Sequence, residues 1–192
     1  MNTTTETAVP KINGVDTERL FQTVDLIRAN TGLAGFQFRL DNQWLTGGLN
    51  RSQIRDFSGA GEDLEHTTPF ELLTDEPAIL LGSDQGPNAG EYLLHALVAC
   101  VTGAMVYHAA ARGIAIEKIE SSVEGDIDLR GFLGLDESVR NGFEQIRIKF
   151  RIKADVPDAL LQEICDLGPK YSPVYDSVTN GLPVKVSAEP MR

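Results

Sequence analysis

Hydrophobic residues recur with the period of a helix near the start of this chain and with the period of a strand soon afterwards. In TERLFQTVDLIRA, residues 17–29, the apolar positions fall on one stripe, which predicts a short amphipathic helix capped by Asp16 or Thr17. FQFRLDNQWL, residues 36–45, alternates apolar and polar side chains. The glycine pair at 47–48 then leads into NRSQIRDF, so this region is predicted to form an antiparallel hairpin.

The longest apolar run lies in the middle of the chain. A third strand at 69–74 and the turn-rich loop DEPAILLGSDQGPNAG precede LLHALVACVTGAMVYHAAA, which spans Leu93 to Ala111. We expect a helix from about Glu91 to Arg112 that ends at Gly113. The run approaches membrane-spanning length, but it lacks basic flanks and contains the polar residues His95, Thr102 and His108. A core helix is therefore expected.

Two segments with period-two alternation follow this helix, at 114–129 and 142–155, and predict a second antiparallel pair. A helix at 157–167, a short helix at 172–179 and a closing strand complete the expected order. Strands grouped before and after one central helix indicate an α+β fold with antiparallel sheets packed around that helix. We expect residues 1–34 to form an arm with a disordered start and a short helix, and residues 35–192 to form one domain.

The balance of charge excludes several partners. The chain has 28 acidic and 17 basic residues, a formal charge of -11 and a pI near 4.7. Such a chain repels nucleic acid and anionic membrane surfaces, so neither is expected as a partner. No basic segment followed by an apolar one marks a signal peptide, and the two cysteines suit the reducing cytoplasm.

No metal or cofactor is expected. Neither cysteine has a second cysteine or a histidine at zinc-ligand spacing, and no glycine-rich phosphate loop is present. Asp126 and Asp128 are predicted to share one strand face. Two carboxylates alone make a weak metal site, so we expect this face to be exposed to solvent. His66 is expected to be solvated and His108 to be structural.

Two motifs carry a resemblance to a known family. PNAGEYLLHALVAC, which ends at Cys100, and SPVYDSVTNGLPV resemble segments of the osmotically inducible protein C (OsmC) family, which includes the organic hydroperoxide resistance proteins. The resemblance covers about residues 36–186. It implies an intertwined α+β homodimer with two central helices between curved antiparallel sheets. It also places Cys100 at the position of the family's peroxidatic cysteine.

The same resemblance supplies the other candidate site residues. The family's second cysteine precedes a proline, and here that position is Ser172. The family glutamate stands ten positions before the helix cysteine, where this chain has a glycine followed by Glu91. On a continuous helix Glu91 lies about half a turn away from Cys100. An arginine from the N-terminal strands completes the family site, and Arg51 is the first candidate, ahead of Arg39 and Arg55.

Two functions are consistent with these residues. In the first, the Cys100 thiolate reduces a small organic hydroperoxide and becomes a sulfenic acid, which Cys165 or an external thiol reduces. In the second, the protein is a non-catalytic dimer that binds a small apolar ligand, with Cys100 in the lining of the pocket. The loss of the second cysteine and of the expected glutamate favours the second function.

Overall fold

The computed structural model describes residues 11–191 and divides into two compact units, with the border after His95 inside one helix. Each unit is described by itself. The chain has the mixed helix and sheet composition that the pattern predicted. The expected division into an arm at 1–34 and a domain at 35–192 stays a prediction.

The described part of the first unit begins with a small hairpin. Strands β1 (Lys11–Ile12) and β2 (Val15–Asp16) pair across Asn13 and Gly14, whose φ angles are 55° and 78°. An Asn-Gly pair is the usual choice for a turn with two positive φ angles. The prediction of a disordered start is therefore wrong for residues 11–16. The rest of that predicted segment, residues 1–10, lies outside the described residues.

The first predicted helix is confirmed as α1 (Thr17–Ala29). The Asp16 carboxylate accepts the backbone N–H of Arg19 at 3.0 Å, so Asp16 is the N-cap. Asn30 ends α1 and its side chain caps the short 3-10 helix η1 (Thr31–Ala34). The chain then enters the sheet.

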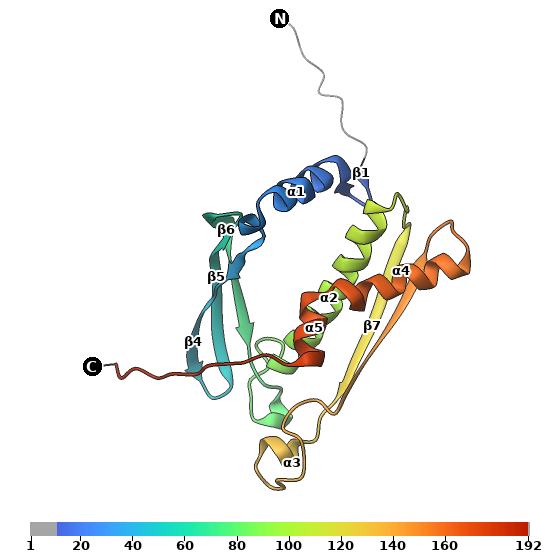
Figure 1. Cartoon of the computed structure of the whole chain (residues 1–192). Helices are drawn as coiled ribbons and strands as arrows, with labels where there is room; N and C mark the ends of the chain where they lie inside the picture. The colour runs from blue at the N-terminus through green and yellow to red at the C-terminus, as the bar shows by residue number, and fades with distance from the viewer. Residues whose placement is uncertain (1–10, 192) are drawn as a thin grey trace, which may run out of the picture. The chain divides into compact units, whose positions relative to one another are not determined.

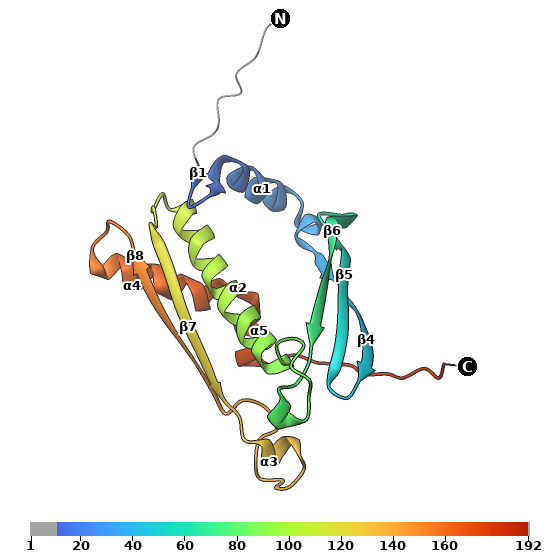
Figure 2. The ribbon, with the colours of Figure 1, turned by 180° about the vertical axis from the view of Figure 1, so that it is seen from behind.

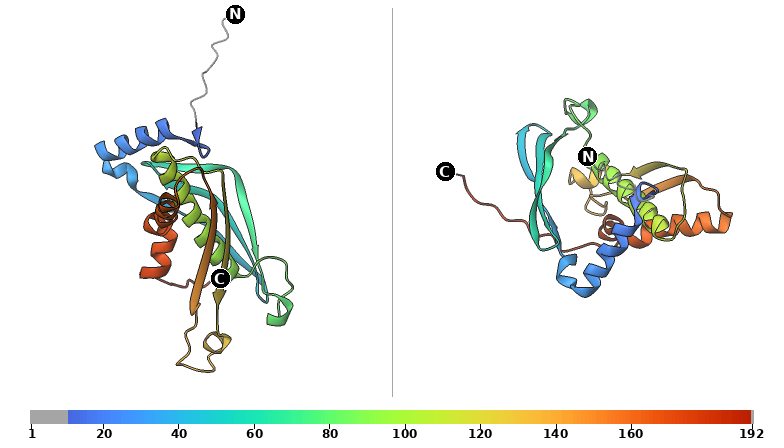
Figure 3. Two further views of the ribbon diagram at one scale, coloured as in Figure 1. Left: turned by 90° about the vertical axis from the view of Figure 1, so that its right-hand side faces the viewer. Right: turned by 90° about the horizontal axis from the view of Figure 1, so that it is seen from above.

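That sheet is antiparallel throughout and has four strands, with β5 pairing with all the others (Figure 3). The strands are β3 (Phe36–Phe38), β4 (Asp41–Thr46), β5 (Leu49–Gly59) and β6 (Glu62–Thr74). The hairpin at 47–48 is confirmed. The continuous strand expected at 36–45 is interrupted, because residues 54–56 of β5 oppose only residues 39–40 and the register shifts by one.

The third strand is longer than its pattern suggested. It begins at Glu62 rather than 69, because Ala60 and Gly61 form a tight turn with φ angles of 54° and 84°. The apolar side chains of this sheet remain largely open within the chain. Those more than half exposed are Phe36 at 53%, Phe38 at 76%, Trp44 at 67% and Phe70 at 54%, and Leu40 between β3 and β4 is 58% exposed.

A buried carboxylate organises the loop that leads from β6 toward the central helix. Asp75 is 1% exposed and accepts the backbone N–H groups of Glu76, Ser83 and Gln85 at 2.8, 3.1 and 3.2 Å. Burial raises the pKa of Asp75. The N–H donors together lower it by more than burial raises it, so the pKa of Asp75 lies below its ordinary value. A Cβ on Gly82 would lie 1.8 Å from the backbone oxygen of Glu76, so this turn requires glycine.

The second unit packs helices on a two-stranded sheet (Figure 1). Its elements are the part of α2 (Ala89–Ala111) after the unit border, β7 (Lys118–Asp126), α3 (Leu129–Phe132), β8 (Gln145–Lys153), α4 (Asp158–Tyr171) and α5 (Pro173–Asn180). Strands β7 and β8 pair from Lys118 with Lys153 to Asp126 with Gln145, and α3 follows at one end of the hairpin (Figure 2). The second antiparallel pair is thus confirmed.

The core of this unit is formed mainly by one face of α2. Leu97, Val101, Met105 and Ala109 recur every four residues, are at most 3% exposed, and pack with Ile164 of α4. The inward side chains of β8 cover the cluster, since Ile146, Ile148, Phe150 and Ile152 alternate along the strand. Burial of each large apolar side chain contributes roughly 1.5–3 kcal/mol, so this face holds the helix firmly.

Glycine permits the close approach of α4 to α2. A Cβ on Gly168 would lie 2.7 Å from Val101 Cγ1 and 3.0 Å from both Met105 Cγ and the Val101 backbone oxygen. Carbon atoms prefer separations of about 3.5–4.0 Å, so any side chain here would force the helices apart. Gly168 therefore sets the distance between the two helices.

The C-terminal part of the chain differs from the expectation in two ways. Helix α4 continues beyond 167 to Tyr171 and includes Pro169, which lacks the N–H that would otherwise donate to the backbone oxygen of Cys165. The prediction of a closing strand is wrong, because residues 181–191 have no regular secondary structure. The alternation of Val184 and Val186, 78% and 92% exposed, had suggested a strand, but a strand requires a partner and none pairs with this segment within residues 11–191.

Candidate active site

Cys100 is a free, partly buried thiol on α2. Its sequence neighbour Val101 belongs to the core stripe, and Cys100 lies about 100° around the helix from it. Gly103, one turn further on, has no atom within 4 Å of an added Cβ, and Tyr107 is 56% exposed. The thiol thus lies between the face that anchors the helix and a face that is open within the chain.

The apolar character of α2 extends beyond its buried face. An 18-residue stretch of the helix has a mean hydropathy of 1.6, and by length and composition alone the helix could also cross a membrane. A soluble core helix meets the same criteria, and four evenly spaced residues of α2 form the core of the second unit. We therefore interpret α2 as a core helix with an additional exposed apolar face.

Arg51 is partly buried on β5, opposite Gln43 of β4 and Leu73 of β6. Within residues 11–191, its guanidinium makes no hydrogen bond or ion pair. The other two arginines considered are engaged. Arg39 donates to Asp56 at 2.6 Å and to Ser58 at 2.8 Å, and Arg55 donates to the side chain of Gln53.

Of these three arginines, only Arg51 has a guanidinium that makes no hydrogen bond or ion pair within residues 11–191, and we call it uncommitted. It belongs to the first unit and Cys100 to the second, so the structure describes the two side chains separately. Their assignment to one site stays a prediction.

Glu91 has a defined structural contact at the start of α2. The backbone N–H of Asn88 donates to the Glu91 carboxylate at 2.9 Å, and the Asn88 side-chain oxygen accepts the N–H of Glu91 at 2.8 Å. This reciprocal pair is a capping box, which satisfies donors that a helix start otherwise leaves unpaired. Glu91 thereby stabilises the beginning of the helix that carries Cys100.

Ser172 is 2% exposed and lies between α4 and α5. Its hydroxyl oxygen accepts the backbone N–H of Tyr175 at 3.1 Å, and Pro173 occupies the first position of α5. Ser172 is thus the N-cap of α5. This capping hydroxyl cannot form a disulfide.

Cys165 lies on α4 next to the fully buried Ile164. Burial raises the pKa of the Cys165 thiol, and the nearby Asp166 carboxylate raises it further. The thiol lines an apolar pocket of about 310 Å³ in the second unit, together with residues of α2, β8 and α5. The sequence offered no signal for this pocket beyond the alternation of β8.

Two histidines make aromatic contacts. His66 is partly buried, with ring centroids 5.3 Å from Phe57 and 5.1 Å from Phe70, so the expectation that it is solvated is wrong. The strand alternation that places these rings together was hidden by the acidic residues around His66. His108 of α2 stacks on Tyr171 of α4 at 3.7 Å, a contact that gives it a structural role.

The two aspartates considered as metal ligands are bound by arginines. Asp126 accepts Arg147 at 2.5 Å and Asp128 accepts Arg130 at 2.6 Å, and these bonds lower the pKa of both carboxyls. Asp126 and Asp128 are therefore engaged in ion pairs. Within residues 11–191, no group of three or more histidine, cysteine, aspartate or glutamate side chains could hold a metal ion.

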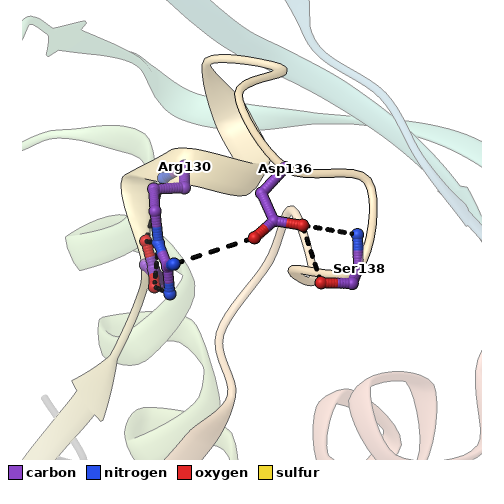
Figure 4. Close-up of polar contacts among 4 residues, drawn as sticks. Arg130, Asp136 and Ser138 are labelled. Carbon is purple, nitrogen blue, oxygen red and sulfur yellow. Dashed lines mark hydrogen bonds and ion pairs between the residues drawn. The ribbon is translucent and has the colours of Figure 1, made fainter.

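Arg130 also connects two parts of the loop that follows β7. Arg130 also approaches Asp136 at 3.7 Å, and Asp136 accepts the N–H and the hydroxyl of Ser138 at 3.0 and 2.6 Å (Figure 4). These contacts hold the base of a loop that exposes Phe132 and Leu135, each 72% exposed. The arrangement is that of a structural ion-pair network.

Comparisons with known proteins bear on this geometry. A family model described as OsmC-like protein matches residues 82–187, which is more than half of the chain. The solved structure of an OsmC-like protein from Mycoplasma pneumoniae has 16% identity and a TM-score of 0.58, covering 76% of this chain and 89% of its own. None of the curated proteins matches the sequence.

Two further structures share the fold. An organic hydroperoxide resistance protein OsmC from Legionella pneumophila has 12% identity and a TM-score of 0.50, covering 74% of this chain and 90% of its own. An OsmC-like protein of unknown function from Vibrio cholerae has 11% identity and a TM-score of 0.53, covering 74% and 94%. At these identities the likeness concerns the fold alone.

Proposed function

Since this chain belongs to the OsmC-like protein family, we propose that it is a thiol-dependent hydroperoxide reductase in which Cys100 is the reactive thiol. The observation that carries the proposal is a free thiol on a helix whose adjoining face is fixed in a core. The resemblance to the family assigns the reactive cysteine to this position. Such a helix holds the sulfur in place while its flank remains open to a small substrate. The name of the Legionella pneumophila protein supports an organic hydroperoxide as the substrate class.

In the proposed reaction the Cys100 thiolate attacks the distal oxygen of the hydroperoxide. The S–O bond forms as the O–O bond breaks, an alcohol leaves after taking up a proton, and Cys100 becomes a sulfenic acid. A thiol then forms a disulfide with Cys100 and releases water. A second thiol reduces that disulfide and restores Cys100.

The reducing thiol is external in this proposal. Ser172 has no sulfur, and its hydroxyl is engaged as the N-cap of α5. The raised pKa of Cys165 keeps that thiol protonated near neutral pH, and a protonated thiol attacks slowly. A small cytoplasmic thiol is therefore the expected reductant.

Arg51 is the proposed partner of the Cys100 thiolate. Its uncommitted guanidinium distinguishes it from Arg39 and Arg55, each of which already donates to a neighbouring side chain. A guanidinium near a thiolate lowers the pKa of the thiol and stabilises the negative charge on the departing oxygen. Glu91 contributes by holding the start of the helix through the capping box.

A homodimer is the proposed assembly. The exposed face of α2 includes Leu93 and Tyr107, and the sheet of the first unit exposes Phe38 and Trp44. Apolar surfaces of this kind usually mark an interface, and a second copy would cover them. Membership of the OsmC-like family supports the same assembly.

The test is hydroperoxide consumption in the presence of an excess of dithiol. Cys100→Ser should abolish it, and Arg51→Ala should slow the reaction of Cys100 at neutral pH by raising the pKa of its thiol. Arg51→Lys should restore part of the rate. Arg28→Ala, an exposed arginine on α1, is the matched control and should behave as the unmodified chain.

The rival hypothesis from the sequence makes the opposite prediction. If the chain is only a binding protein, Cys100 reacts with hydroperoxide no faster than a free thiol does. Equal rates for the folded chain and a short peptide containing Cys100 would therefore reject the proposed reductase.

A further inference from the structure

The pocket beside Cys165 is formed by four elements that are remote in the sequence. Leu97 and Val101 of α2 are its most buried lining residues, at 3% and 1% exposure. Alternate residues of β8, from Ile146 to Phe150, form another wall. Cys165 and Pro169 lie one turn apart on α4, and α5 supplies the remainder. All of these residues belong to the second unit.

The chemistry of the lining is uniformly uncharged. Among residues 11–191, no aspartate, glutamate, lysine, arginine or histidine lines the pocket. The hydroxyl of Thr179, a lining residue on the exposed side of α5, donates to the Tyr175 backbone oxygen at 2.8 Å. That hydroxyl is thus used within the helix. A charged ligand would lose its hydration without gaining an ion-pair partner, so the pocket favours neutral molecules.

The volume limits the size of the occupant. A dry cavity of about 150 Å³ lined by leucine, isoleucine and phenylalanine accommodates benzene. The present pocket, at about 310 Å³, is about twice that size and lies at the lower end of the range of small-molecule sites. Phe150 and Tyr175 give the lining two aromatic rings, which suit a planar apolar group about the size of two fused rings.

We propose that this pocket binds one neutral, planar apolar molecule of bicyclic size, with the Cys165 thiol in its wall. Cys100 is not among the lining residues, so the site is distinct from the proposed peroxide site. The proposal does not depend on any reaction at Cys100. The raised pKa of Cys165 fits the apolar surroundings, because burial disfavours the thiolate.

Cys165 provides a built-in probe for the test. In the full chain carrying Cys100→Ser, Cys165 is the remaining cysteine, and its alkylation by N-ethylmaleimide can be followed by mass spectrometry. Naphthalene, close to its solubility limit, should slow the alkylation at least threefold. Naphthalene-2-sulfonate has the same rings with a charge, and at the same concentration it should leave the rate unchanged.

Two valine substitutions provide the matched pair. Val178→Phe, also in the Cys100→Ser chain, places an aromatic ring on a lining position and should abolish the protection by naphthalene. Val184→Phe places the same ring on an exposed residue outside the pocket and should leave the protection intact. Circular dichroism confirms the fold of each.

Three results would overturn the proposal. The first is an alkylation rate that naphthalene does not change in the Cys100→Ser chain, a result that needs no pocket variant to fold. The second is equal protection by naphthalene and naphthalene-2-sulfonate. The third is full protection in a folded Val178→Phe chain. Because Cys100 is absent throughout, none of these results bears on the reductase.

Discussion

Substitution of Gly168 by alanine tests the packing of α4 on α2. At an exposed position inside a helix, alanine is more favourable than glycine by about 0.8–1.0 kcal/mol. At Gly168 this gain is opposed by a Cβ that would lie 2.7 Å from Val101 Cγ1, about 1 Å inside the preferred carbon separation. Overpacking of this kind costs typically about 1–3 kcal/mol, so we expect a net loss of about 1 kcal/mol.

The measurement is the free energy of unfolding from urea denaturation at constant protein concentration. A loss of about 1 kcal/mol corresponds to a decrease in the melting temperature of roughly 2–4 °C for a chain of this size. The exposed Glu163 on the same helix gives the propensity contribution alone, as the difference between Glu163→Ala and Glu163→Gly. Subtracting that difference isolates the cost of the contact.

A double-mutant cycle identifies the contacting atom. Val101→Ala removes the Cγ1 atom that the new Cβ would meet, so in that background the cost of Gly168→Ala should decrease. It should not disappear, because the Val101 backbone oxygen remains 3.0 Å away. A Gly168→Ala chain that is more stable than the unmodified chain would refute the close approach of these helices.

Three further outcomes are expected. Ser172→Ala should decrease stability by about 0.5–2 kcal/mol through loss of the α5 cap, measured by thermal denaturation, while peroxide consumption at 25 °C stays unchanged; a loss of activity in the folded chain would contradict the external-thiol cycle. Asp75→Asn should remove an acid-sensitive part of stability. The pKa of Asp75 is lower in the folded chain, so its contribution to the free energy of unfolding is present above the unfolded pKa of about 3.9 and is lost as the pH falls through the folded value. The urea midpoint of Asp75→Asn should therefore depend less on pH below about 3.9 than that of the unmodified chain. Gly103→Leu should prevent dimer formation, measured by light scattering, because its Cβ meets no atom within 4 Å in one chain and its side chain extends from this face; a stable Gly103→Leu dimer would show that this face is not the interface.

Much of the secondary structure followed from residues close together in the sequence. The bounds of α1 were readable because its stripe, its Asp16 cap and the terminating Asn30 lie within 15 residues of one another. The end of α2 was readable because Gly113 adopts a φ of 74°, a conformation that few other residues tolerate. The motif ending at Cys100 indicated the family, and the family model confirmed it.

Other structural features depended on contacts between residues far apart in the sequence, which a local pattern does not predict. Residues 181–191 alternate like a strand, but alternation provides no neighbouring strand. The interruption of the strand at 36–45 arises from the extra residue on β5 that opposes it. Likewise, the sequence analysis placed Arg51 ahead of Arg39 and Arg55, but only the structure shows that Arg39 and Arg55 donate to neighbouring side chains.

The pocket beside Cys165 is the clearest case of a feature decided by tertiary structure. Helix caps and periodicity are set within a few residues, so the sequence alone indicated the four longer helices α1, α2, α4 and α5. A cavity is the space that remains after side chains from α2, β8, α4 and α5 have packed, and its volume depends on where those helices stop approaching one another. That distance is set by contacts such as Gly168 against Val101, which join positions 67 residues apart and leave no local pattern.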